Sequence, residues 1–200
     1  TNQFLAKANQ AVYDFSGGFF LNNQNLSKNQ FDLRNDELYT FDDGLLQCYD
    51  RFQEQGKIKD HSLTIFHLLG QHVNYKLRYP RNRTYFWASS YEDKRPELNH
   101  KQRKVLSQYD NACRYNDSIV DQIIKRFENQ EGIIIYMPDH GEECYEGDRG
   151  FICRNHSAAI DYDLARYEFE IPFWIYCSPR YIHAHPDIYQ QILQARNRPF

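Results

Sequence analysis

The pattern of apolar and polar positions predicts a chain in which short strands alternate with helices. Residues 132–142 start with a continuous apolar run and end abruptly in an acid, a histidine and a glycine. Three consecutive isoleucines favour an extended strand, and a run that is apolar on both faces suits a strand covered on both sides. Pro138, which has no N–H to donate, helps to end this strand.

A second strand is expected over residues 62–70, which are also apolar almost throughout and also lead to a histidine, His72. A helix is expected from about residue 101 to residue 129, because apolar residues recur there at helical spacing. Gly132 then closes the helix and begins the first strand. Helix, tight link and apolar strand are typical of the second half of a βαβ unit.

Weaker patterns predict three further elements. Asp42 or Asp43 can cap a helix that Gly56 ends. Residues 171–176 form another strand, whose internal proline suggests an edge or the start of pairing. A last helix opens with Pro186 in its first turn.

Length and charge narrow the class of protein. Two hundred residues normally make one domain, and 24 Lys plus Arg against 27 Asp plus Glu give a formal charge of −3. This near balance argues against a nucleic-acid partner bound through its phosphates. No apolar run is long enough to span a bilayer and nothing near Thr1 resembles a signal peptide, so we expect a soluble chain. Because it does not begin like a natural amino terminus, we also expect a piece of a longer protein.

The five cysteines are an odd number, so at least one is unpaired within this chain. Cys144 and Cys153 bracket a glycine-containing loop. They are compatible with a disulfide in an oxidising compartment and equally with two free thiols.

Asp139 and His140 are the first candidates for chemistry. Open α/β sheets bind ligands just beyond the carboxyl ends of their strands, where this pair lies. A carboxylate oxygen beside an imidazole nitrogen suits zinc or manganese, and Gly141 allows the backbone to approach a ligand or ion closely. A polar turn is the alternative, because two ligands do not complete a metal site.

Three segments that follow one another along the chain resemble segments of the phosphoethanolamine transferases, and the resemblance covers roughly residues 42–177. The third segment, at 139–142, is shared more widely across the sulfatase and alkaline-phosphatase superfamily. The segments are His-Leu-Leu-Gly-Gln-His at 67–72 followed by Tyr79-Pro80, Tyr-Asp-Asn at 109–111 followed by Ile-Val-Asp-Gln-Ile-Ile at 119–124, and Asp-His-Gly-Glu at 139–142.

The resemblance implies an α/β sandwich of the alkaline-phosphatase/sulfatase type: a mostly parallel central sheet with helices on both faces, incomplete at its N-terminal side. Residues 1–200 would be a single, partial domain. It also implies a catalytic zinc ion bound by Asp139 and His140. His72 and His156 would bind the substrate phosphate or a second zinc ion, although Ser157 follows His156 where the family has glycine. Lys7 matches a lysine that contacts the phosphate.

Glu142, by the same resemblance, supports the metal ligands by accepting a hydrogen bond; a solvated loop acid is the alternative. The family's remaining zinc ligand, a glutamate, and its threonine nucleophile lie upstream of the segment that resembles the start of this chain. We therefore expect no catalytic nucleophile here, and we expect the transmembrane helices of the family to be missing as well. The chain would be the later part of a catalytic domain on the periplasmic face of the bacterial inner membrane.

The activity implied for the full-length protein is transfer of phosphoethanolamine from a phospholipid to lipid A or a glycan. Zinc would activate the threonine, and the chain alone would be inactive and bind zinc weakly. Arg78, Arg81 and Arg83 would either receive a phospholipid headgroup or form a solvated basic loop. The alternative functions are a sulfatase or phosphoglycerol transferase of the same superfamily, or a non-catalytic relative that binds glycans or lipids.

Overall fold

The computed structural model describes residues 12–14, 31–32, 40–58, 60, 62–147, 150–154 and 162–196. The chain divides into two compact units, residues 1–119 and 120–200, which are described one at a time. That the two units form the single domain expected from the sequence stays a prediction.

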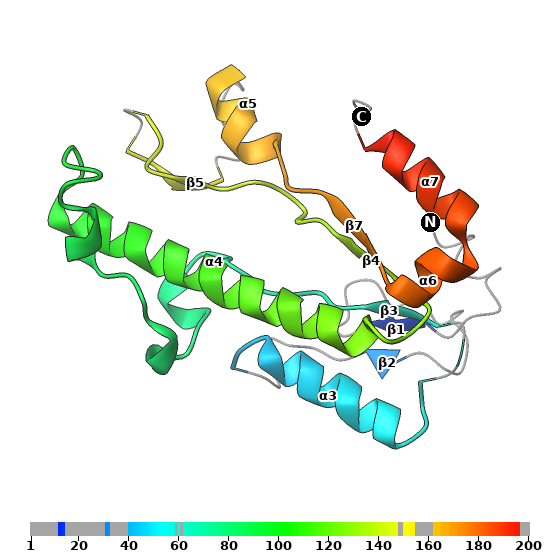
Figure 1. Ribbon diagram of the computed structural model, residues 1–200. Coiled ribbons are helices and arrows are strands. Elements are labelled where there is room, and N and C mark those ends of the chain that lie inside the picture. Colours follow the sequence, from blue (N-terminus) through cyan, green and yellow to red (C-terminus); the bar gives the residue numbers. More distant parts are fainter. Residues whose placement is uncertain are drawn as a thin grey trace. The chain divides into compact units, whose positions relative to one another are not determined.

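The first unit contains a three-stranded parallel sheet (Figure 1). Its central strand, β1 (Val12–Asp14), lies between β2 (Phe31–Asp32) and β3 (Leu63–Ile65). The parallel order agrees with the predicted fold class. Strand β3 is shorter than the predicted 62–70, because the N–H groups of Leu69 and Gly70 donate to a side-chain carboxylate and not to a neighbouring strand.

Helix α3 (Asp43–Glu54) confirms the predicted helix and its glycine end. Gly56 has φ +63°. The N–H of Lys57 donates to the carbonyl of Phe52 (3.0 Å), the arrangement that closes a helix through a left-handed residue. Asp42 occupies the N-cap position, but its side chain does not cap this helix.

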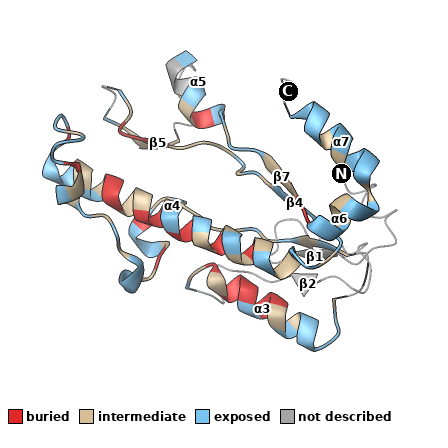
Figure 2. Cartoon of the chain, in the orientation of Figure 1, coloured by how far each residue is buried: buried red, intermediate tan, exposed pale blue. Residues whose placement is uncertain are grey.

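Helix α4 (His100–Phe127) confirms the long predicted helix. It begins with a reciprocal cap: Asn99 accepts from the N–H of Gln102 (3.0 Å), and Gln102 accepts from the N–H of Asn99 (2.9 Å). One face is buried, as expected from its periodicity (Figure 2). The buried apolar residues of that face are Leu106, Ala112, Tyr115, Ile119 and Ile123.

Three short 3₁₀ helices connect β3 to α4 in the first unit. They are η1 (Tyr75–Leu77), η2 (Arg81–Arg83) and η3 (Ala88–Tyr91). The ring of Tyr75 packs edge-on against Tyr109 of α4, with 5.1 Å between centroids. The connection is therefore packed against α4 at Tyr75, and backbone N–H groups of Tyr85 and Phe86 are hydrogen-bonded to Asn111 of the same helix.

The second unit is built on an antiparallel pair, β4 (Ile133–Tyr136) and β7 (Trp174–Cys177). Tyr136 and Trp174 are direct partners in this pair and their rings stack at 5.1 Å. A strand is present as predicted, but it starts later than the predicted 171–176: β7 begins two residues after Pro172, so the proline precedes the paired residues. The other elements are β5 (Glu143–Cys144), β6 (Ile152–Cys153), α5 (Tyr162–Phe169), α6 (Pro179–Ala184) and α7 (Pro186–Ala195).

The expectation that β4 is covered on both faces is wrong for the described residues. Ile135 is 60% exposed, and Ile133 and Met137 on the same face are exposed as well. Successive side chains of a strand point to opposite faces, so only the face of Ile134 and Tyr136 is partly covered.

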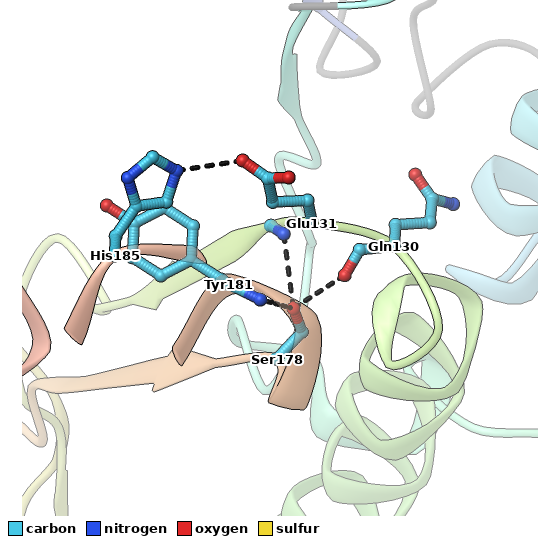
Figure 3. A network of polar contacts seen from close by, with 6 residues as sticks. Gln130, Glu131, Ser178, Tyr181 and His185 are labelled. Atoms are coloured by element: carbon cyan, nitrogen blue, oxygen red, sulfur yellow. Dashed lines mark hydrogen bonds and ion pairs between the residues drawn. The ribbon is translucent and has the colours of Figure 1, made fainter. Parts of the chain in front are cut away.

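Ser178 fastens the end of β7 to the link between α4 and β4 (Figure 3). Its hydroxyl donates to the carbonyl of Gln130 (2.5 Å) and accepts from the N–H of Gly132 (3.2 Å). Beside it, Nε2 of His185 lies 2.8 Å from Oε1 of Glu131. Ser178 also accepts from the N–H of Tyr181 and so caps α6, a helix that was not predicted from the sequence.

Cys144 and Cys153 do not form a disulfide in this structure. The register of β5 and β6 places Cys144 opposite Ile152, while Cys153 is opposite Glu143. Within the described part of the chain, no helix is long and apolar enough to cross a membrane.

Candidate metal and phosphate site

Asp139 and His140 lie in the loop that follows β4, where the sequence predicted them. The Asp139 side chain is 90% exposed and the His140 side chain 20% exposed. Oδ1 of Asp139 lies 3.8 Å from Nε2 of His140. The loop therefore presents a carboxylate oxygen and an imidazole nitrogen side by side at the end of a strand.

The ring of His140 is oriented by its own loop. Nδ1 lies 2.6 Å from the carbonyl oxygen of Gly141, and because a carbonyl only accepts, Nδ1 carries the proton of this hydrogen bond. In the neutral ring, Nε2 then keeps its lone pair. A metal-binding histidine characteristically donates its other N–H in this way.

These two donors fit a zinc ion. A tetrahedral ion with bonds of about 2.0–2.2 Å holds its donors roughly 3.4 Å apart, slightly closer than Nε2 of His140 and Oδ1 of Asp139 lie here. A small rotation of the exposed Asp139 side chain closes that difference. No group of three or more potential metal-binding side chains occurs among the residues that the structure describes. The pair supplies two of the four ligands that a tetrahedral site requires.

Gly141 is required by close packing against α5. Its N–H donates to the carbonyl of Glu168 (2.8 Å), and a Cβ placed on it would lie 2.1 Å from the carbonyl oxygen of Tyr167. From the sequence, this glycine was expected to let the backbone approach a ligand or ion. The close approach exists, but its partner is the backbone of α5.

His72 lies on a turn in the first unit, after β3. The N–H of His72 donates to the carbonyl of Leu69 (3.0 Å), and Gly70 between them has φ +52°. The buried carboxylate of Asp42 accepts from the N–H groups of Leu69 (3.1 Å) and Gly70 (2.9 Å). Asn116 of α4 faces the same turn, 3.5 Å from where a Cβ on Gly70 would lie.

Arg78 holds the other side of this turn. Its Nε donates to the carbonyl of His72 (2.9 Å) and its Nη2 to that of Val73 (3.0 Å). Nδ1 of His72 lies 3.0 Å from the same Val73 carbonyl, so Nδ1 bears the proton here too and Nε2 of the exposed ring is left for a ligand.

The sequence-based site is thus described only in part. Lys7 and His156 lie outside the described residues. Glu142 is half-buried, and its supporting role stays a prediction. His72 belongs to the first unit, and Asp139 and His140 belong to the second, so a common pocket for them stays a prediction as well.

Two residues that hold the His72 turn in place were not recognised as such in the sequence. Asp42 was interpreted as a possible helix cap, because an acid before an apolar helical run is an ordinary capping signal. Arg78 was interpreted as a headgroup ligand or a solvated residue. In both cases the actual partner is backbone on the His72 turn, and no local sequence pattern reports a bond that spans 27 residues, as that from Leu69 to Asp42 does.

Comparison with protein families agrees with the motifs. The Sulfatase family model matches residues 3–195. The chain belongs to the sulfatase family. Its relatives include phosphoethanolamine transferase EptC of Escherichia coli, 34% identical over 131 residues, which are 64% of this chain and 22% of that protein. They also include phosphoethanolamine transferase EptA of Helicobacter pylori, 31% identical over 141 residues, which are 67% of this chain and 26% of that protein.

The solved structures extend this similarity to the fold. The C-terminal periplasmic domain of EcEptC from E. coli, in complex with Zn, matches with a TM-score of 0.71 at 26% identity, over 95% of this chain and 55% of that one. The soluble domain of lipooligosaccharide phosphoethanolamine transferase A from Neisseria meningitidis matches with a TM-score of 0.66 at 19% identity, over 96% of this chain and 59% of that one. The resemblance and the sulfatase-like α/β fold inferred from sequence are both confirmed. The chain spans about a quarter of the curated relatives and just over half of the solved domains.

Proposed function

We propose that this chain is part of a phosphoethanolamine transferase that acts on lipid A or a related glycan at the periplasmic face of the bacterial inner membrane. Support comes from relatives named phosphoethanolamine transferase and from one named Kdo(2)-lipid A phosphoethanolamine 7''-transferase, in E. coli. A phospholipid is the proposed donor, and the membrane anchor is proposed to lie in the rest of the protein.

The observation that carries the proposal is the oriented pair in the loop after β4. Asp139 and His140 would hold zinc, through Oδ1 and through the Nε2 left free by the bond from Nδ1 to Gly141. When bound, zinc supplies charge neutralisation at phosphorus and lowers the pKa of a coordinated hydroxyl. The hydroxyl is proposed to belong to a threonine outside this chain.

The chain's own residues would bind and orient the phosphoryl group. His72, on its clamped turn, would act through Nε2: a doubly protonated ring would donate to a non-bridging oxygen, and a neutral ring would bind a second zinc ion. His156 and Lys7 would be further phosphate ligands. Glu142 would accept a hydrogen bond that supports the metal ligands. The negative charge of the phosphoryl group would then be bound by side chains whose positions are fixed before the substrate binds.

The test uses the full-length protein. We expect His140→Ala and Asp139→Ala each to reduce transfer of phosphoethanolamine to lipid A by at least about a hundredfold, measured by mass spectrometry of the lipid product. We also expect them to reduce the zinc content measured by elemental analysis. Asp117→Ala, which changes an exposed acid on α4, is the control.

Unchanged transfer in both variants would overturn the proposal. Hydrolysis of a sulfate ester without any transfer would favour a sulfatase instead. For the 200-residue chain by itself we expect only weak zinc binding, because two of four ligands are supplied. Tight, stoichiometric zinc binding by this chain would contradict the assigned ligand set.

A further inference from the structure

A short extended segment between η2 and η3 is pinned to α4 by one buried amide. Oδ1 of Asn111 accepts from the N–H groups of Tyr85 (2.7 Å) and Phe86 (3.0 Å). Nδ2 of Asn111 donates to the carbonyl of Phe86 (2.9 Å) and to that of Ser107 within the helix (2.7 Å). Both ends of the amide are satisfied, so the segment is presented rigidly and not as a free loop.

This segment displays aromatic side chains to solvent. Tyr85 is 43% exposed and Trp87 is 58% exposed. In an extended chain, residues two apart point to the same side, and Phe86 between them is the better covered. Large aromatic side chains exposed on an ordered segment indicate a contact surface when side chains of one charge lie beside them.

The side chains that lie beside Tyr85 are positively charged. The guanidinium carbon of Arg114 lies 4.1 Å from the centre of the Tyr85 ring. Hydrogen bonding from Arg83, and then from Arg114, lowers the pKa of the Tyr85 hydroxyl. Arg83, Tyr85, Trp87 and Arg114 together are called the aromatic–basic surface below.

The part of the sequence that contains this segment carries basic residues and no acidic ones. The sequence contains no acidic residue between Asp60 and Glu92, although the chain as a whole has a formal charge of −3. The basic residues in that interval are Lys76, Arg78, Arg81 and Arg83. Arg78 is committed to the His72 turn, whereas Lys76, Arg81 and Arg83 are exposed.

We propose that the aromatic–basic surface docks on a membrane rich in anionic phospholipid. Trp and Tyr rings favour the level of the headgroups, where one part of the ring is apolar and the other is wet. Arginine matches phosphate oxygens with paired donors, and basic residues near an anionic leaflet add to binding cumulatively. The surface consists of exposed side chains on a segment that is fixed to α4, which suits a lipid interface. This inference does not depend on the proposed transfer reaction, since vesicle binding needs neither nucleophile nor metal.

The test follows Trp87 directly. The chain has two tryptophans, so Trp174→Phe leaves Trp87 as the sole reporter and keeps an aromatic ring against Tyr136. With phosphatidylethanolamine–phosphatidylglycerol vesicles, we expect Trp87 emission to move to shorter wavelength and to be quenched by lipids brominated in their acyl chains. Phosphatidylcholine vesicles should produce neither change, and high salt should reverse both.

Sedimentation with the same vesicles measures affinity. Arg83→Ala and Arg114→Ala should each weaken binding about fivefold, and Trp87→Ser should weaken it at least as much. The matched controls, Arg180→Ala and Tyr162→Ser, change exposed residues of the second unit and should leave affinity unchanged. Circular dichroism checks that each variant is folded.

Three outcomes would overturn the proposal. One is absence of vesicle binding, and another is binding with unchanged Trp87 emission, which would place the contact elsewhere. The third is tight binding to a soluble phosphorylated oligosaccharide with no preference for vesicles, which would assign the surface to a glycan. Should a serine at position 87 prevent folding, the Trp174→Phe fluorescence measurement still decides the matter.

Discussion

The turn that carries His72 and the loop that carries His140 both leave Nε2 of a histidine available, but they are ordered by different means. The His72 turn is held by two ionised side chains, Asp42 on its N–H groups and Arg78 on its carbonyls. The His140 loop is held by backbone, through the close contact of Gly141 with α5. The first arrangement depends on charge and the second on the absence of a side chain.

The largest expected effect is that of Gly141→Ala. A methyl group 2.1 Å from the carbonyl oxygen of Tyr167 cannot be accommodated without moving backbone. We expect unfolding by urea to show a loss of about 3 kcal/mol. Gly132→Ala is the matched control, because a Cβ there would meet nothing within 4 Å. Equal effects of the two substitutions would show that the loop is not held by this contact.

Asp42→Ala tests the other region. It removes the acceptor of two backbone N–H groups and should cost about 2 kcal/mol in the free energy of unfolding. Hydrogen exchange should speed up at the amides of Leu69 and Gly70 while the amide of Gly141 stays protected. The exposed Asp60→Ala is the control. Faster exchange at Gly141 as well would mean that the two regions are not ordered separately.

Arg78→Lys keeps the charge but loses the fork that reaches the carbonyls of His72 and Val73 together. We expect a loss of about 1 kcal/mol and a change in the NMR shifts of the His72 ring. Arg81→Lys, at an exposed position, should change neither. An unchanged His72 ring in Arg78→Lys would show that Asp42 alone holds the turn.

The smallest effect near neutral pH is expected for Tyr115→Phe. Burial, and then the charge of Asp43, raises the pKa of Tyr115 above its ordinary value of 10.0. Above about pH 10 the unfolded chain releases this proton while the folded chain keeps it, so the free energy of unfolding falls as pH rises. Urea unfolding between pH 9 and 11 should show a shallower fall for Tyr115→Phe.

Tyr145→Phe is the counterpart in the second unit, where burial, followed by Cys144, also raises the pKa of the tyrosine. It should flatten the alkaline fall less, because the shift at Tyr115 is the larger one. A steeper fall in either variant would contradict the direction of these pKa shifts.

The local pattern of apolar and polar residues was sufficient to predict the long helix and the strand that leads to Asp139 and His140. The helical spacing of apolar residues predicted α4, and the isoleucine run predicted β4 with Asp139 and His140 at its end. Both follow from side-chain period and backbone propensity, which act over a few neighbouring residues. The family resemblance also followed from sequence alone, because its motifs are contiguous.

Tertiary structure decided which groups hold those residues in place. Asp42 was recognisable as a residue before a helix. Its partners, however, are the N–H groups of Leu69 and Gly70, which lie far from it in the sequence and are brought close to it by the fold. Gly141 was recognisable as a permissive residue, but only the fold brings α5 against it. Hydrogen bonds and steric limits depend on distance in space. The sequence therefore determined the types and order of the chemical groups, and the packing of distant segments determined what orients each of them.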